Sequence, residues 1–315
     1  MTKSIPLSVK AAERSLAPNL SFLFSGRPWV MGVLNATPDS FYAGSRIAHV
    51  ESAVHMAERM LEENVDLLDI GGESTRPGAE AVSLGTELER VLPIIDALHD
   101  RWPDIPLSID TQKADVARQA IRHGVSLIND VSALRRDPEM ADVAAEFACP
   151  VVLMHSQGVP RTMQQAPQYK EVIADVRMFF EERLAFAASR HIAEDRVILD
   201  PGIGFGKTVE HNLTLLKHLA DFLVFGRPLL VGVSRKSFIG KVIAEASPPS
   251  PPPNTSGGKG GRRPGEASFP PEERLEGSLA AALWAVGQGA RGLRVHDVLA
   301  TRRALQVWKG IEEAL

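Results

Sequence analysis

The chain has 315 residues, 44% of them hydrophobic, which is enough to bury a sizeable core in one large domain or two average ones. Its formal net charge of -4 gives no basic excess, so we expect no nucleic-acid partner. A single cysteine, Cys149, excludes an intrachain disulfide framework and is typical of a reducing compartment. No apolar run approaches the roughly 18 to 20 residues of a membrane span, and the N-terminus lacks the apolar core of a signal peptide. We therefore predict a cytoplasmic protein that does not bind membranes.

Eight short runs rich in Val, Ile and Leu alternate with longer amphipathic segments. The runs occupy residues 29–35, 65–72, 106–111, 126–133, 150–156, 197–204, 228–235 and 292–297. Each is nearly continuously apolar, which is typical of parallel strands covered on both faces. Amphipathic segments such as residues 113–124, 168–191 and 298–315 are predicted helices. Eight strand–helix pairs favour an α/β fold of the closed (β/α)8 barrel type, a TIM barrel, over an open sheet, and no GxGxxG motif follows the first run.

One segment interrupts this order. Residues 246–271 are dominated by Pro, Gly and Ser and contain no Val, Ile or Leu. Such a segment cannot bury enough apolar area to offset the entropy lost on ordering. We therefore predict a flexible insert within a single barrel domain of residues 26–315, which follows an N-terminal extension of residues 1–25.

Polar residues stand at the carboxyl end of every predicted strand. In chain order they are Asn35, Asp69 with Glu73, Asp110, Asn129 with Asp130, His155, Asp200, Ser234 with Arg235 and Lys236, and Arg294 with His296 and Asp297. In a barrel these ends and the loops after them form the active face. One polar end residue can be a simple strand stop. Eight predict a ligand site, because buried polar groups cost about 1 to 3 kcal/mol each when unpaired.

The charges of this ring indicate the kind of ligand. Cations from the last two strands and from a glycine-bounded loop suit a phosphate group, and they are Arg76, Lys236, Arg294 and His296. Acceptors expected deeper in the barrel suit a heterocycle with N–H donors, and they are Asp110, Asn129 and Asp200. The ring thus predicts a ligand that is phosphorylated at one end and rich in N–H groups at the other.

Other signals are weaker. Residues 200–208 read DPGIGFGKT but lack the GxxxxGK[ST] spacing of a phosphate loop, so Asp200 is expected to matter more than Lys207. The histidines away from the strand ends have no paired ligand spacing, which disfavours a zinc site. No GxSxG motif is present and Cys149 has no nucleophile context, so covalent catalysis is disfavoured.

Taken together, eight motifs resemble those of the dihydropteroate synthase family, in the family's order. They read LNATPDSF, DIGGESTRPGA, SIDT, INDV, LMHSQGVPRTMQ, DPGIGFGKT, GVSRKSFIG and RVHDV. The match as a whole spans Val30 to Trp308 outside the insert. The family's fold is a (β/α)8 barrel. The resemblance implies a folate-pathway transferase that joins 6-hydroxymethyl-7,8-dihydropterin pyrophosphate to p-aminobenzoate. It also implies Mg2+ as a cofactor and a homodimer formed through the last helices.

The resemblance further implies a role for individual residues. The pterin would be bound by Asp110, Asn129, Asp200, Lys236 and Arg294, with Arg294 stacked on its ring. The pyrophosphate would be bound by Asn35, Arg76, Arg294 and His296, with Asn35 near the metal. The p-aminobenzoate would be bound by Thr75, Pro77, Phe205, Ser234 and Lys236. The catalytic residues would be Asp39, Asp110, Lys236 and Arg294.

Two other interpretations are open at this point. A methyltetrahydrofolate-type methyltransferase would share the barrel and its acidic pterin floor, but it would not need the cations Arg76, Arg294 and His296. A non-catalytic paralogue that binds a pterin would keep the floor without turnover. An assay for dihydropteroate and pyrophosphate separates all three.

Overall fold

The computed structural model of the chain describes residues 20–36, 46–74, 79–158, 163, 167–246 and 269–314. Within these residues eight parallel strands form one sheet in the order β6-β5-β4-β3-β2-β1-β8-β7. They are β1 (Trp29–Asn35), β2 (Leu67–Gly71), β3 (Leu107–Asp110), β4 (Leu127–Asp130), β5 (Val151–Met154), β6 (Val197–Asp200), β7 (Leu230–Val231) and β8 (Gly292–Val295). A parallel bridge between Leu199 and Leu229 brings β6 against the start of β7 and closes the ring. The predicted (β/α)8 barrel is confirmed, and each strand lies within its predicted run.

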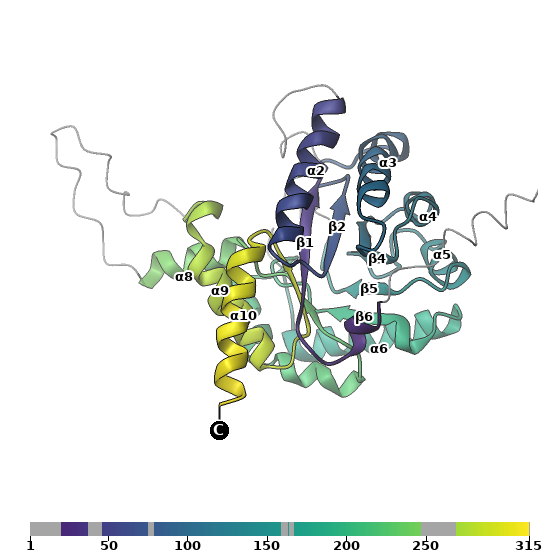
Figure 1. Cartoon of the computed structure of the whole chain (residues 1–315). Helices are drawn as coiled ribbons and strands as arrows, with labels where there is room; N and C mark the ends of the chain where they lie inside the picture. The colour runs from purple at the N-terminus through teal and green to yellow at the C-terminus, as the bar shows by residue number, and fades with distance from the viewer. Residues whose placement is uncertain are drawn as a thin grey trace, which may run out of the picture.

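Helices surround the barrel (Figure 1). They are α2 (Arg46–Glu62), α3 (Leu84–Arg101), α4 (Ala114–Arg122), α5 (Met140–Glu146), α6 (Val172–Ser189), α7 (Val209–Lys217), α8 (Ser237–Ala246), α9 (Leu275–Gly287) and α10 (Val298–Glu312). Short 3-10 turns are η1 (Leu20–Phe24), η3 (Glu194–Arg196), η4 (Leu219–Phe225) and η5 (Pro271–Glu273). The helix α3 shows how they form: Ser83 caps its first turn by accepting from the Thr86 amide at 3.1 Å. Helices α8, α9 and α10 lie together on one side of the barrel.

The interior of the barrel holds a separate apolar cluster, which we call the plug. Its members are Leu23, Trp29, Met31, Leu67, Leu127, Val152, Ile198 and Leu230, and all are fully buried. Most stand at the start of their strands, so the plug fills the amino end of the barrel. Leu23 comes from η1, and its carbonyl oxygen accepts from Trp29 Nε1 at 3.3 Å. Part of the segment before residue 26 is therefore packed under the barrel.

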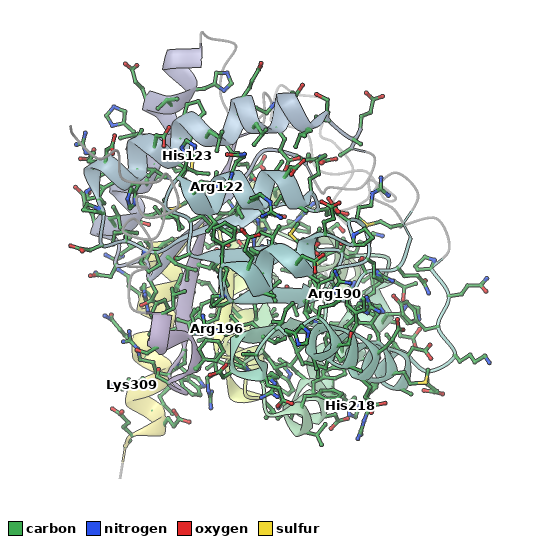
Figure 2. All side chains as sticks on the ribbon, turned by 90° about the vertical axis from the view of Figure 1, so that its right-hand side faces the viewer. Arg122, His123, Arg190, Arg196, His218 and Lys309 are labelled. Atoms are coloured by element: carbon green, nitrogen blue, oxygen red, sulfur yellow. The ribbon has the colours of Figure 1, made fainter. Side chains whose placement is uncertain are left out.

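The outer surface carries scattered charges of both signs. Figure 2 labels Arg190 and His123 on one such face. Arg190 pairs with Asp142, and His123 Nδ1 lies 2.6 Å from Asp96 Oδ1. Exposed pairs of this kind stabilise a fold by about 1 kcal/mol at most. Among the described helices, none combines the length and hydropathy needed to span a membrane.

Candidate active site

The strands' alternation places polar side chains directly above the plug. Side chains two residues apart on a strand share a face. Three plug residues are each followed two positions later by a polar residue: Leu67 by Asp69, Leu127 by Asn129, and Ile198 by Asp200. Asp69, Asn129 and Asp200 are at most 5% exposed. The carboxyl half of the barrel interior is therefore lined by buried polar groups.

Arg294 on β8 joins two carboxylates from neighbouring parts of the barrel. Its Nε donates to Asp69 Oδ2 at 2.7 Å and its Nη2 donates to Asp110 Oδ2 at 2.8 Å. Asp69 Oδ2 also accepts from Asn129 Nδ2 at 3.0 Å. The structure thus brings three residues of the predicted pterin site together: Asp110, Asn129 and Arg294. It also places Asp69 at the centre of the group. Asp69 had been predicted only as a member of the polar ring, with no role of its own.

Two oxygens of this group are left over. Asp69 Oδ1 and Asp110 Oδ1 are buried and have no hydrogen-bond partner within the part of the chain that the structure describes. Buried acceptors without partners are costly, so such atoms are candidates to receive ligand donors. Burial raises the pKa of Asp110 to about 7, against the opposing effect of Arg294 and with added repulsion from Asp69, Glu87 and Asp130.

The loop after β6 and the loop after β7 meet at Lys236. Its Nζ lies 4.3 Å from the centre of the Phe205 ring and donates to the Ile203 carbonyl oxygen. Burial lowers the pKa of Lys236 to about 8, although Asp200 opposes this shift, and burial raises the pKa of Asp200. Gly204 makes the approach feasible, because a Cβ there would come within 2.8 Å of Lys236 Cδ. Predicted pterin and p-aminobenzoate residues are therefore in contact.

The remaining predicted residues lie around the rim. Ser234 Oγ lies 3.1 Å from His296 Nδ1 and also accepts from the His296 amide at 3.2 Å. Asn35 ends β1, in register with Gly71 at the end of β2. The predictions for Asp39, Thr75, Arg76 and Pro77 lie outside the described residues.

A buried lysine on the loop after β6, Lys207, was not predicted as a ligand residue. Lys207 is 2% exposed, and its Nζ donates to the carbonyl oxygens of Gly202 at 3.0 Å and Phe205 at 3.1 Å. It also lies 2.9 Å from Nδ1 of His155, whose pKa is lowered to about 2 by burial and by nearby cations, so the imidazole is neutral and can accept. Lys207 thus holds the turn that carries Phe205. This structural role is compatible with the prediction that residues 200–208 do not form a phosphate loop.

A second unpredicted cluster lies beside the end of β2. Lys113 pairs with Glu73 and with the fully buried Glu87, which accepts from Thr111 Oγ1 at 2.6 Å. Glu73 comes two residues before Thr75 in the chain. This cluster therefore anchors the residue from which the STRPGA segment departs.

A barrel with charged side chains gathered at the carboxyl ends of its strands has the architecture of an enzyme. Comparisons with known proteins agree. The family model described as "Pterin binding enzyme" matches residues 31–296. A dihydropteroate synthase from Synechocystis sp. is 43% identical over 286 residues, which is 91% of each chain.

Solved structures give the same result. The Xanthomonas albilineans dihydropteroate synthase with 4-aminobenzoic acid superposes with a TM-score of 0.79 at 43% identity, covering 92% of this chain and 94% of that one. The same bacterium's enzyme in complex with 7,8-dihydropteroate gives a TM-score of 0.76 at 40% identity, covering 92% and 95%. The chain belongs to the pterin binding enzyme family, among its dihydropteroate synthases.

Proposed function

We propose that the chain condenses 6-hydroxymethyl-7,8-dihydropterin pyrophosphate with p-aminobenzoate to give 7,8-dihydropteroate and pyrophosphate. The observation that carries the proposal is the Arg294–Asp110 pair at the carboxyl end of the barrel, with Asp110 Oδ1 buried and unpartnered among the described residues. An acceptor of this kind suits an N–H donor of a pterin ring. The solved relative with 7,8-dihydropteroate supports the same ligand class.

The pterin would occupy the deepest part of the site. Asp110, Asn129 and Asp200 supply acceptors from three neighbouring or nearby strands, and all three are buried. Lys236 would donate to a ring nitrogen or carbonyl, because its ammonium already faces Asp200 from the loop after β7. Arg294 would lie against the ring face with its guanidinium held by carboxylates.

The pyrophosphate would lie toward the rim, near Arg294, His296, Asn35 and Arg76. The described residues contain no group of three His, Cys, Asp or Glu side chains that could hold a metal by themselves. Asn35 offers a hard oxygen ligand, and Mg2+ is commonly held by one or two protein oxygens together with substrate phosphates. Asn35 therefore fits a shared Mg2+ site. When bound, the ion would neutralise negative charge on the leaving group.

The reaction needs positioning and charge more than it needs a base. The amine of p-aminobenzoate is neutral at pH 7, so its lone pair can attack the pterin methylene directly. The C–N bond forms, the C–O bond breaks with its electron pair on pyrophosphate, and the amine then releases a proton. Ionised Asp110, with Asp39, would favour the positive charge that develops at the methylene, while Arg294 would stabilise the leaving group.

The p-aminobenzoate would lie between the loops after β6 and β7. Phe205 and Lys236 are already in contact there, and Ser234 is fixed by His296. Thr75 and Pro77 would complete this part of the site from the loop after β2. A carboxylate next to the Lys236 ammonium and an aromatic ring over Phe205 match the two ends of this substrate.

We also propose that the enzyme is a cytoplasmic homodimer. An apolar groove of about 460 Å³ lies between α7, α8 and α9, and its lining includes Leu213, Phe238, Ile239 and Trp284. Trp284 is 53% exposed and Leu213 is 44% exposed. Large exposed apolar groups on adjacent helices favour association, and we expect Trp284→Glu to shift the sedimentation profile from dimer to monomer.

The catalytic proposal is tested by one incubation. Purified protein is mixed with the pterin pyrophosphate, p-aminobenzoate and Mg2+, and dihydropteroate and pyrophosphate are quantified. We expect both products in equal amounts. Pterin binding without either product would instead favour a non-catalytic paralogue, and methyl transfer from methyltetrahydrofolate would favour the methyltransferase.

A further inference from the structure

Asp69 on β2 lies between two residues that are proposed to bind the pterin. It is fully buried, and its Oδ2 accepts from Arg294 Nε at 2.7 Å and from Asn129 Nδ2 at 3.0 Å. We infer that Asp69 is a positioning residue for pterin recognition, which acts by holding Arg294 and Asn129 in their binding orientations. The inference rests on the proposed function, because that function makes Arg294 and Asn129 ligand contacts.

The geometry explains why a carboxylate is needed at this position. The planar guanidinium of Arg294 offers donors in a fixed fork, one to Asp69 and one to Asp110. Two separate anchors prevent rotation of the plane, so its face keeps one direction. One anchor alone would leave Arg294 free to swing about the remaining contact. Asp69 therefore determines which way the cation faces.

The same oxygen determines the orientation of Asn129. An amide side chain can present either its NH2 group or its oxygen to a given neighbour. Because the NH2 of Asn129 donates to Asp69, the carbonyl oxygen of Asn129 is left to accept from a ligand N–H. Loss of the carboxylate would weaken this preference, so Asn129 could also turn its NH2 group toward the ligand.

Asp69 also acts on Asp110 through charge. The charged groups that face Asp110 are Arg294 from β8, Asp69 from β2, Glu87 from α3 and Asp130 from β4. Burial is the main cause of the raised pKa of Asp110, Arg294 lowers that pKa, and the three acids raise it. Removal of the Asp69 charge takes away one repulsion, so ionisation of Asp110 should then occur at lower pH.

The test compares Asp69→Asn with Asp66→Asn. Asp66 is a matched control, because it is also a largely buried carboxylate paired with an arginine, Arg302. Unlike Asp69, it accepts from the Val30 amide at the amino end of β1. Calorimetry with 6-hydroxymethylpterin from pH 5 to 9 gives the affinity. We expect Asp69→Asn to bind about 10-fold or more weakly, the scale of a lost charge-assisted hydrogen bond. The acid limb of its affinity profile should also move to lower pH.

Asp66→Asn should keep the parent's affinity and profile. A folded Asp69→Asn with the parent's affinity and pH profile would overturn the inference, and so would a loss of affinity of equal size in both variants. The Asp66→Asn control separates positioning from a general loosening of the barrel, because loosening would lower the affinity in both variants. Because the assay measures binding alone, a parent that binds the pterin without making dihydropteroate would end the proposed function and leave this test intact.

A measurement on the parent covers the case in which Asp69→Asn does not fold. The Nε–H of an arginine held by a buried carboxylate exchanges slowly with solvent and gives its own resonance in ¹⁵N NMR spectra. We expect one such slowly exchanging signal that disappears in Arg294→Lys. Its absence from the parent would overturn the inference, because Arg294 would then not be fixed by Asp69.

Discussion

The two ends of the barrel interior use the same strands for opposite purposes. At the amino end, the plug packs apolar side chains such as Trp29 and Ile198, all fully buried. At the carboxyl end, two residues further along, Asp69 and Asp200 are also buried, yet both carry a carboxyl group. Burial raises the pKa of Asp200. We therefore expect stability and ligand binding to depend on separate layers of one structure.

The buried polar residues above the plug, which we call the polar layer, destabilise the unliganded protein. Asp69 Oδ1 and Asp110 Oδ1 are buried without partners in the part of the chain that is described, and each such atom destabilises the fold by about 1 to 3 kcal/mol. The plug beneath offsets this cost through close packing. Changes in the plug should therefore lower stability and spare binding, whereas changes in the polar layer should lower binding and spare stability.

The largest expected effect is on the plug. Trp29→Ala removes a fully buried indole that packs over Gly292, and it should lower the free energy of unfolding by about 3 to 5 kcal/mol. Urea denaturation measures this loss. Ile198→Val is the graded control, with an expected loss of about 0.5 to 1.5 kcal/mol. In both variants the folded fraction should bind the pterin with the parent's affinity. A weaker affinity would show that binding depends on the plug as well as on the polar layer.

The sequence predicted the barrel well because its main signal is local. Eight continuous apolar runs identified eight parallel strands, and polar residues at the ends of these runs, such as Asp69, Asn129 and Asp200, are buried in the barrel. What it could not show is which side chains from distant strands meet. Asp69 was visible as a strand-end carboxylate, but its role as the shared partner of Asn129 and Arg294 depends on contacts across 60 and 225 positions.

Lys207 illustrates a second limit. Its neighbours Gly202, Gly204 and Gly206 are visible in the sequence, but their positive φ angles are not. In that turn the carbonyl oxygens of Gly202 and Phe205 accept from Lys207 Nζ. A signal was present all the same. Glycines at every second position before a lysine indicate a tightly turned loop, and such a loop has carbonyl oxygens that need a donor.

The next effect tests the polar layer directly. Asp200→Asn keeps the shape of the side chain and removes its charge, so it should weaken pterin binding by about 1.5 to 3 kcal/mol. Because burial raises the pKa of Asp200, the neutral amide should not lower the stability of the unliganded protein. Calorimetry and urea denaturation on the same sample check both statements. Unchanged pterin affinity would remove Asp200 from the site.

A third test concerns the pH dependence of stability. Burial raises the pKa of Asp110 from its ordinary value of 3.8 to about 7 in the folded protein, so between these pH values the unfolded chain has lost a proton that the folded protein keeps. Stability from this group should therefore fall as pH rises from about 4 to 7, by at most about 1.4 kcal/mol per pH unit, and stay level above that. Asp110→Asn should lack this fall. Parallel stability curves for parent and variant would contradict the burial argument.

The smallest effect is expected from changes in the Pro/Gly-rich insert. We expect excision of residues 248–268, with a short Gly/Ser linker, to leave kcat and KM within about a few-fold of the parent, because loop length changes stability only slowly. The boundary matters. The Phe269 carbonyl oxygen accepts from Arg274 Nε at 2.6 Å, and Arg274 Nη1 donates to the Arg235 carbonyl oxygen at 2.8 Å, next to Lys236.

A matched deletion of residues 248–270 removes that carbonyl and should lower activity more than the shorter one, since Arg274 is 7% exposed and would lose a buried acceptor. Steady-state kinetics of the two deletions, with circular dichroism to confirm folding, give the comparison. Equal activity in both would show that the Phe269–Arg274 contact does not support the loop of Lys236. A large loss of activity in the shorter deletion would instead show that the insert contributes to the site. Function would then depend on a third region besides the plug and the polar layer.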